Sequence, residues 1–296
     1  MVEANGVELC TESFGERADP PILLIMGVGA SMLWCDERFC RLLSDGGRFV
    51  IRYDHRDTGR SITYEPGRPG YTGADLVADA VGVLDAYGLS VAHVVGVSAG
   101  GAFAQLLALD FPDRVLSLVL ISTSPATPSD RDLPAPTREF TQFVTTAKVD
   151  WSKAASVIGY LLAYVRVLAG TERPFDASAA RTLVRRDVDR ARDFAARQNH
   201  NAIDEAHSDK PLSSIRVPTL VIHGTADPMF PIEHGRALAR EILGARLLPL
   251  QGAGHGIEQV DWETISAAII EHTGRPAPVQ VERTSVSRAS SSSNAS

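Results

Sequence analysis

AHVVGVSAGG, residues 92–101, is the stretch that decides how this chain folds. Its apolar first half predicts a buried strand, and the residues that follow it have a helical character. The pattern G-x-S-x-G lies at the junction, with Ser98 at its centre and Gly96 and Gly100 two residues to either side. Between a strand and a helix, this pattern is typical of a nucleophile elbow, whose sharp turn exposes a serine hydroxyl. The sequence therefore predicts that Ser98 is a nucleophile.

Length and composition allow one large α/β domain. The chain has 296 residues, 44% of them hydrophobic, which is enough for a full core. A net charge of −7 gives no indication of a nucleic acid or an anionic membrane as partner. We find no signal peptide and no apolar run that could span a bilayer, so we expect a soluble, cytoplasmic protein. Cys10, Cys35 and Cys40 lack the spacing of metal ligands, and we expect no metal site.

Strand and helix patterns alternate along both flanks of the elbow. This alternation predicts a mostly parallel, doubly wound α/β sheet. The expected strands are an edge strand over 7–14, buried strands over 22–26, 48–53, 92–97, 115–121 and 218–223, and a short strand over 246–250. The expected helices cover about 36–44, 75–87, 99–110, 232–243 and 259–272.

Residues 125–212 interrupt this alternation. Four prolines are spread over the first twelve of these residues, at 125, 128, 134 and 136. Helical patterns follow at 137–147, 151–169, 177–187 and 189–206, without a visible buried strand. We expect a helical cap inserted into a core of residues 1–124 and 213–274, over the sheet edge where ligands bind in such folds. The alternative is a set of extra helices packed on the sheet. Residues 275–296 are rich in serine and are predicted to be a disordered tail.

A nucleophilic serine needs a base, and the base needs a group that orients it. Asp227 follows the strand at 218–223, and His255 lies in a glycine-flanked loop after the strand at 246–250. Each alone is weak evidence, because Asp-Pro turns and loop histidines are usually structural. Both fall at the same sheet edge as Ser98, however, in the order Ser, Asp, His that is associated with this architecture. We therefore predict a catalytic triad.

The oxyanion hole and the pocket wall are predicted from position alone. The expected donors are the backbone N–H groups of Ala99, next to the nucleophile, and of Val28, in the loop after the strand at 22–26. Trp34 is a candidate substrate-binding residue, with core packing as the alternative.

Other polar residues are expected to be structural. His223 lies inside a strand, and Asp54 and Arg56 belong to a charged turn to which we assign a scaffold role before a catalytic one. His200 and His207 fall in the predicted cap, where contact with a substrate is an open alternative.

Three motifs resemble those of the α/β-hydrolase superfamily: GVSAG at 96–100, GTADPMFP at 224–231 and GAGHG at 252–256. The resemblance covers about residues 7–272. Within the superfamily, Met26-Gly27, RYDHRDTGRS at 52–61 and ADAVGVLDAYG at 78–88 are similar to aclacinomycin methylesterase and related esterases. The resemblance implies an α/β-hydrolase fold with a helical cap and a triad that needs no cofactor.

The leading hypothesis is a serine carboxylic ester hydrolase (esterase) that works through an acyl-enzyme. Its expected partner is a small to medium apolar ester, for which the resemblance suggests a polyketide methyl ester; we expect a monomer or a homodimer. The same triad also serves C–C bond hydrolysis, lactone opening and cofactor-free perhydrolysis. A non-catalytic ligand-binding receptor of the same fold is the alternative from another class.

Overall fold

The computed structural model describes residues 1–127 and 132–274. Its main sheet has seven strands in the order β3-β5-β4-β6-β7-β8-β9. Only β3 is antiparallel to its neighbour; every other pair is parallel. The predicted fold class is therefore confirmed. The strands are β3 (Thr11–Phe14), β4 (Pro21–Ile25), β5 (Phe49–Tyr53), β6 (Ala92–Val97), β7 (Val115–Ile121), β8 (Thr219–Gly224) and β9 (Arg246–Leu250).

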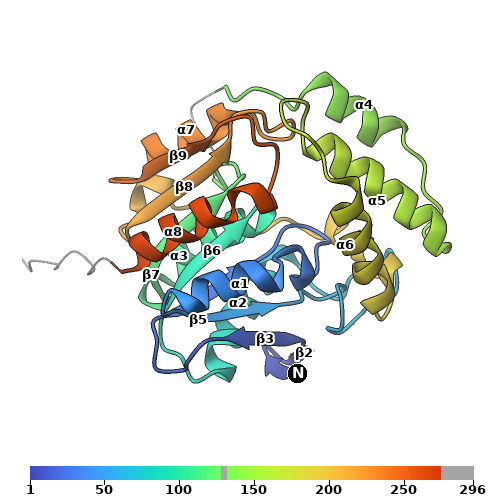
Figure 1. The fold of residues 1–296 in the computed structure, drawn as a ribbon. Coiled ribbons are helices and arrows are strands. Elements are labelled where there is room, and N and C mark those ends of the chain that lie inside the picture. Colours follow the sequence, from blue (N-terminus) through green and yellow to red (C-terminus); the bar gives the residue numbers. More distant parts are fainter. Residues whose placement is uncertain (128–131, 275–296) are drawn as a thin grey trace, which may run out of the picture.

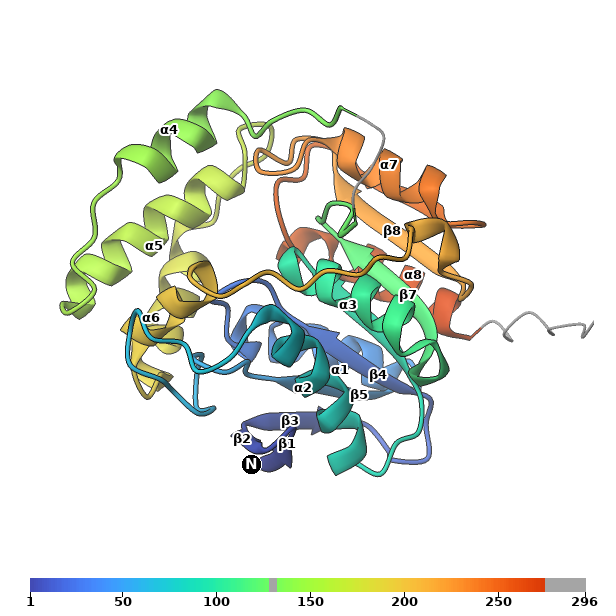
Figure 2. The ribbon, with the colours of Figure 1, turned by 180° about the vertical axis from the view of Figure 1, so that it is seen from behind.

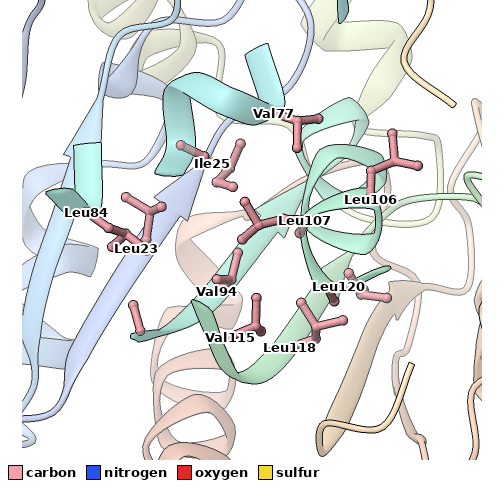
Figure 3. Packing of buried hydrophobic residues seen from close by; sticks show 14 of the residues in the cluster. Leu23, Ile25, Val77, Leu84, Val94, Leu106, Leu107, Val115, Leu118 and Leu120 are labelled. Carbon is pink, nitrogen blue, oxygen red and sulfur yellow. The ribbon is translucent and has the colours of Figure 1, made fainter. Parts of the chain in front are cut away.

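Helices cover both faces of this sheet (Figures 1 and 2). One face packs against α1 (Glu37–Asp45) and α8 (Trp262–Thr273). The other packs against α2 (Gly73–Ala86), α3 (Ala99–Asp110) and α7 (Ile232–Glu241). Figure 3 shows this second core, where Leu23, Ile25 and Val94 of the strands face Val77 and Leu107 of the helices. Because both faces are covered, the central strands are buried on both sides and appear in the sequence as continuous apolar runs.

The N-terminal region differs from the expected single edge strand. Strands β1 (Val2–Ala4) and β2 (Val7–Leu9) form a separate hairpin, and β3 begins only at Thr11. The hairpin turn is Asn5-Gly6, with both residues at positive φ, as a two-residue type I′ turn requires. Cys10 lies between β2 and β3, and its backbone N–H donates to Ser61 Oγ instead of to a neighbouring strand.

The connection between β7 and β8 is helical in its described residues. It contains α4 (Arg138–Thr146), α5 (Ala154–Leu168) and α6 (Ala177–Arg190), which lie together at one side of the sheet (Figures 1 and 2). Two short 3-10 helices, η3 (Phe194–Asn201) and η4 (Leu212–Ser214), lead back to the sheet. Of the other 3-10 helices, η1 (Met32–Trp34) precedes α1, η2 (Pro112–Arg114) lies between α3 and β7, and η5 (Gln259–Asp261) directly precedes α8. We refer to residues 132–212 as the helical segment.

One expected helix in this segment is wrong. The pattern at 189–206 is not a single helix, because α6 ends at Arg190 and the chain after η3 is irregular. The reason is tertiary: Asn199 donates to Asp57 Oδ2, and His200 bonds to the backbone of the core at Gly29 and Arg56. The tail predicted over 275–296 lies outside the described residues.

None of the helices within residues 1–127 and 132–274 is long and apolar enough to cross a membrane. The same residues contain no cluster of side chains suited to hold a metal ion. Cys35 and Cys40 are buried free thiols, and Cys10 is a partly buried one.

A buried ion pair fastens α2 to the charged turn after β5. Arg56 contacts both carboxylate oxygens of Asp79, at 2.7 and 2.8 Å, and Asp79 is fully buried. We expect Asp79→Ala to lower the free energy of unfolding by about 3–5 kcal/mol, because it leaves a buried cation without its partner. Asp85 on the same helix is the matched control, since its pair with Arg114 is exposed and its loss should cost about 1 kcal/mol or less. Urea denaturation measures both variants; equal small losses would contradict this expectation.

Candidate active site

Ser98 occupies a strained turn between β6 and α3. Its backbone φ is +56°, although such values are rare for residues other than glycine. The turn is held by hydrogen bonds from Ser98 N to Ile121 O at 2.9 Å and from Gly101 N to Ser98 O at 2.8 Å. Strain of this kind persists only where the surrounding structure enforces it, and it clusters at functional sites. The strand–turn–helix context expected of the elbow is therefore present.

The glycines on either side of Ser98 are required by close backbone contacts. A Cβ atom at Gly96 would lie 2.3 Å from Gly100 O, and one at Gly100 would lie 2.1 Å from Ile25 O. Neither position has room for a side chain. The two glycines thus let α3 lie directly against β6 and β4, which is why the motif needs them at this spacing.

Asp227 and His255 meet at the same end of the sheet. Asp227 follows β8 and His255 follows β9, and Asp227 Oδ2 lies 2.8 Å from His255 Nδ1. The loop of His255 is tied to the helical segment, because His255 N donates to Leu168 O at the end of α5. The structure therefore brings two of the predicted residues into contact.

The surroundings of Asp227 keep its carboxylate ionised. Its Oδ1 accepts hydrogen bonds from the backbone N–H groups of Met229 and Phe230, both at 2.9 Å. Burial alone would raise the pKa of Asp227, but His255 and these hydrogen bonds hold the pKa below its usual range. His223 lies 3.6 Å from the same carboxylate, but its own pKa is lowered by burial and its Nε2 lies 2.7 Å from Phe230 O. His223 is thus a neutral, buried residue, as expected from its place in a strand.

The loop after β4 lies against Ser98. A Cβ atom at Gly27 would be 3.0 Å from Ser98 Cβ and 3.4 Å from Ser98 Oγ. The next two residues are Val28, which is exposed, and Gly29, whose φ is +62°. The backbone of this loop therefore borders the serine hydroxyl, at the place where the sequence predicts a second oxyanion donor.

His200 of the helical segment fixes this loop. The Gly29 N–H donates to His200 Nδ1 at 2.9 Å, so the ring proton is on Nε2, which lies 2.7 Å from Arg56 O. Burial, with a smaller contribution from His55, lowers the pKa of His200 to about 3. The imidazole therefore stays neutral and remains a hydrogen-bond acceptor at ordinary pH. Sequence reasoning left His200 as a cap residue of open role, because no local signal links it to a loop 171 positions away.

A cavity of about 1820 Å³ joins these elements. Ser98, Ala99, His255, Val28 and Trp34 all line it, whereas Asp227 does not. The indole N–H of Trp34 donates to Asp187 Oδ2 of α6 at 2.7 Å, so this wall is held by the helical segment. The cavity exceeds the roughly 300–1,000 Å³ of common ligand pockets, which leaves room for a sizeable substrate.

The charged turn after β5 is structural in its contacts. Asp54 accepts from Met32 N at 2.9 Å, from Arg60 N at 2.9 Å and from Arg190 Nη1 at 2.6 Å. Arg56 forms an ion pair with Asp79. Neither side chain belongs to the cavity wall, in agreement with the scaffold role expected for both.

Comparison with known proteins identifies the family to which this architecture belongs. Residues 20–257 match the family model described as the alpha/beta hydrolase fold. The chain belongs to the α/β-hydrolase family. The resemblance noted for the three motifs is thereby confirmed.

Individual α/β-hydrolases extend the similarity over nearly the whole chain. Rhodomycin D methylesterase DauP of Streptomyces sp. (strain C5) is 34% identical over 289 residues, which cover 92% of this chain and 97% of that protein. Rhodomycin D methylesterase DnrP of Streptomyces peucetius is also 34% identical, with the same coverage. Among solved structures, the enol-lactonase from Burkholderia xenovorans LB400 is 26% identical, with a TM-score of 0.71, over 92% of this chain and 98% of that one.

Proposed function

We propose that this α/β-hydrolase is a carboxylic ester hydrolase in which Ser98, His255 and Asp227 form the catalytic triad. The observation that carries the proposal is the 2.8 Å contact between His255 Nδ1 and the ionised Asp227, beside a cavity that also holds the strained Ser98. The two methylesterase relatives support ester hydrolysis as the reaction. In this proposal Trp34 forms part of the substrate-binding wall.

Each residue of the triad has one role in the proposed reaction. Because the Asp227 carboxylate accepts the Nδ1 proton, the lone pair of His255 is on Nε2. His255 takes the hydroxyl proton of Ser98 as this oxygen attacks the ester carbonyl carbon. It returns the proton to the leaving alcohol and then activates water, which hydrolyses the acyl-enzyme. Asp227 holds the tautomer and stabilises the imidazolium.

The oxyanion of the tetrahedral intermediate would be bound by the backbone N–H groups of Ala99 and Val28. Ala99 begins α3, whose N-terminus adds a positive partial charge at this place. The loop of Val28 borders Ser98 through Gly27. In the same proposal the core comprises residues 1–124 and 213–274, and residues 125–212 act as a cap over the site.

The substrate we propose is a methyl ester on an apolar body, because both curated relatives are methylesterases and the cavity is large. A panel of an aromatic methyl ester, a lactone and a vinylogous diketone, compared by kcat/KM, tests this assignment. We expect methanol release from the ester at the highest kcat/KM. A preference for the lactone or the diketone would assign lactonase or C–C hydrolase chemistry instead. Saturable binding without any turnover would favour the receptor alternative.

The contact of His200 with the oxyanion loop leads to a further prediction. His200→Leu removes the acceptor of the Gly29 N–H, so the neighbouring Val28 N–H loses its fixed direction. We expect kcat to fall about 10- to 100-fold, with KM nearly unchanged, because this loop acts mainly on the transition state. His200→Asn, which keeps an acceptor, should retain more of the activity. Since the pKa of His200 is about 3, the ratio of wild-type to variant kcat should stay constant across neutral pH.

The control for this prediction is His207→Leu. His207 is an exposed histidine of the same helical segment, and its loss should leave kcat close to that of the wild type. Steady-state hydrolysis of a p-nitrophenyl ester measures all three variants. Equal kcat values for His200→Leu and His207→Leu would show that the Gly29 contact has no part in catalysis.

A further inference from the structure

Arg197 lies in the cavity wall beside the oxyanion loop. It belongs to η3 of the helical segment and lines the same cavity as Ser98 and His255. It lies against Gly29, because a Cβ atom at Gly29 would be 2.8 Å from Arg197 Nε and 3.0 Å from Nη2. The guanidinium group therefore reaches the site from the side of the proposed oxyanion donors.

The positive charge of Arg197 has no hydrogen-bond or ion-pair partner within residues 1–127 and 132–274. Its Nη1 atom is buried without a hydrogen bond, and no described carboxylate forms an ion pair with it. The guanidinium packs over the Phe194 ring, whose centroid lies 4.9 Å from the guanidinium carbon. Asp187 acts on it only at longer range, since the two oxygens of this carboxylate accept from Ser31 Oγ and Trp34 Nε1.

Another arginine of the same cavity shows the contrast. Arg173 Nη1 contacts Asp261 at 2.6 Å, and its Nη2 bonds to the backbone oxygen of Gln251. Arg173 is thus neutralised by the protein, whereas Arg197 is not. Burial lowers the pKa of Arg197, but a guanidinium group remains protonated at any working pH. Arg197 is half-buried, and its Nη1 atom is shielded from water without a hydrogen-bond partner. Such a charge is unfavourable, and an anion that enters the cavity would offset this cost.

We propose that Arg197 binds a carboxylate group of the substrate, distinct from the ester that is cleaved. The planar guanidinium fork matches a carboxylate in geometry and charge. The cavity wall includes a group of aromatic side chains in mutual contact, Trp151, Tyr160 and Tyr164, so it suits an apolar body that carries this group. The substrate class is therefore an ester with an apolar body and a free carboxylate. This inference deepens the proposed function and rests on it.

Binding to the Ser98→Ala variant tests the inference without turnover. The probes are 2-naphthoate and its neutral isostere 2-naphthamide, titrated by isothermal calorimetry. We expect the naphthoate to bind at least about tenfold more tightly than the amide, because only the anion forms an ion pair with the arginine and can accept two parallel hydrogen bonds from its guanidinium fork. Adding Arg197→Met should reduce this ratio to near one, and adding Arg197→Lys should retain part of it.

Arg192→Met is the matched control, because Arg192 is an exposed arginine five positions earlier in the same segment. It removes the same charge and should leave the ratio unchanged. Equal binding of the two probes to Ser98→Ala, or no saturable binding of the naphthoate, would overturn the inference even if Arg197→Met failed to fold. A ratio that Arg197→Met leaves unchanged would overturn it as well. None of these three results would affect the esterase assignment, which depends on the activity of the wild type and its loss in Ser98→Ala.

Discussion

Ser98→Ala is expected to lower kcat by about 10⁴-fold or more, with little change in KM. The reason is that alanine cannot form the acyl-enzyme, while the cavity that binds the substrate stays intact. The elbow itself should fold, because its geometry is imposed by Gly96, Gly100 and the packing of α3 against β4 and β6. Burst and steady-state hydrolysis of p-nitrophenyl esters measures the loss.

Ser124→Ala is a matched control for this variant. Ser124 also lines the cavity, but its hydroxyl is paired with His234 Nδ1 at 2.8 Å. Its removal should change kcat severalfold at most. A fluorophosphonate should label the wild type at Ser98 and leave Ser98→Ala unlabelled. Near-normal turnover by Ser98→Ala would refute the proposed nucleophile.

Asp227→Asn is expected to lower kcat by about 10⁴-fold, the size of effect that follows when the orienting carboxylate of a triad is replaced by an amide. An asparagine oxygen can still accept from Met229 N and Phe230 N, so the loop after β8 should keep its shape. The negative charge beside His255 is lost, however, and the amide can stabilise the wrong tautomer. The loss should therefore appear in kcat, with an unchanged melting temperature.

Glu258→Gln tests whether a nearby carboxyl group, and not Asp227, orients His255. Glu258 lies three residues after His255, lines the cavity and has a buried Oε1 without a partner among the described residues. Burial raises the pKa of Glu258, which makes it a poorer stabiliser of the imidazolium than the ionised Asp227. We expect Glu258→Gln to stay within about tenfold of the wild-type kcat. A collapse of activity in Glu258→Gln, with Asp227→Asn nearly normal, would reverse the assignment.

Much of the fold was predictable because its signals are local. Each central strand is an apolar run a few residues long, and Ser98 stands where one such run turns into a helix. The parallel sheet follows from the alternation of these elements, and it places the ends of β6, β8 and β9 at one edge. No further information was needed to predict that Asp227 and His255 lie close together.

The errors came from elements whose ends are set by distant partners. The pattern at 189–206 is helical by composition, but Asn199 and His200 bond to the core and interrupt the helix. The break at Cys10 likewise depends on the Ser61 hydroxyl, which lies 51 positions away. Local periodicity carries no information about such partners.

The sequence by itself determined the sheet, the elbow and the order of the polar residues along its edge, since strand and helix periods and the glycines of a tight turn are properties of neighbouring residues. Only the tertiary structure decided that His200 binds the loop after β4, that Arg197 has no hydrogen-bond or ion-pair partner among the described residues, and how large the cavity is. These features arise where the helical segment meets the core, and the contacts join residues far apart in the chain. Three-dimensional packing determines these contacts, and the periodicity of neighbouring residues cannot predict them.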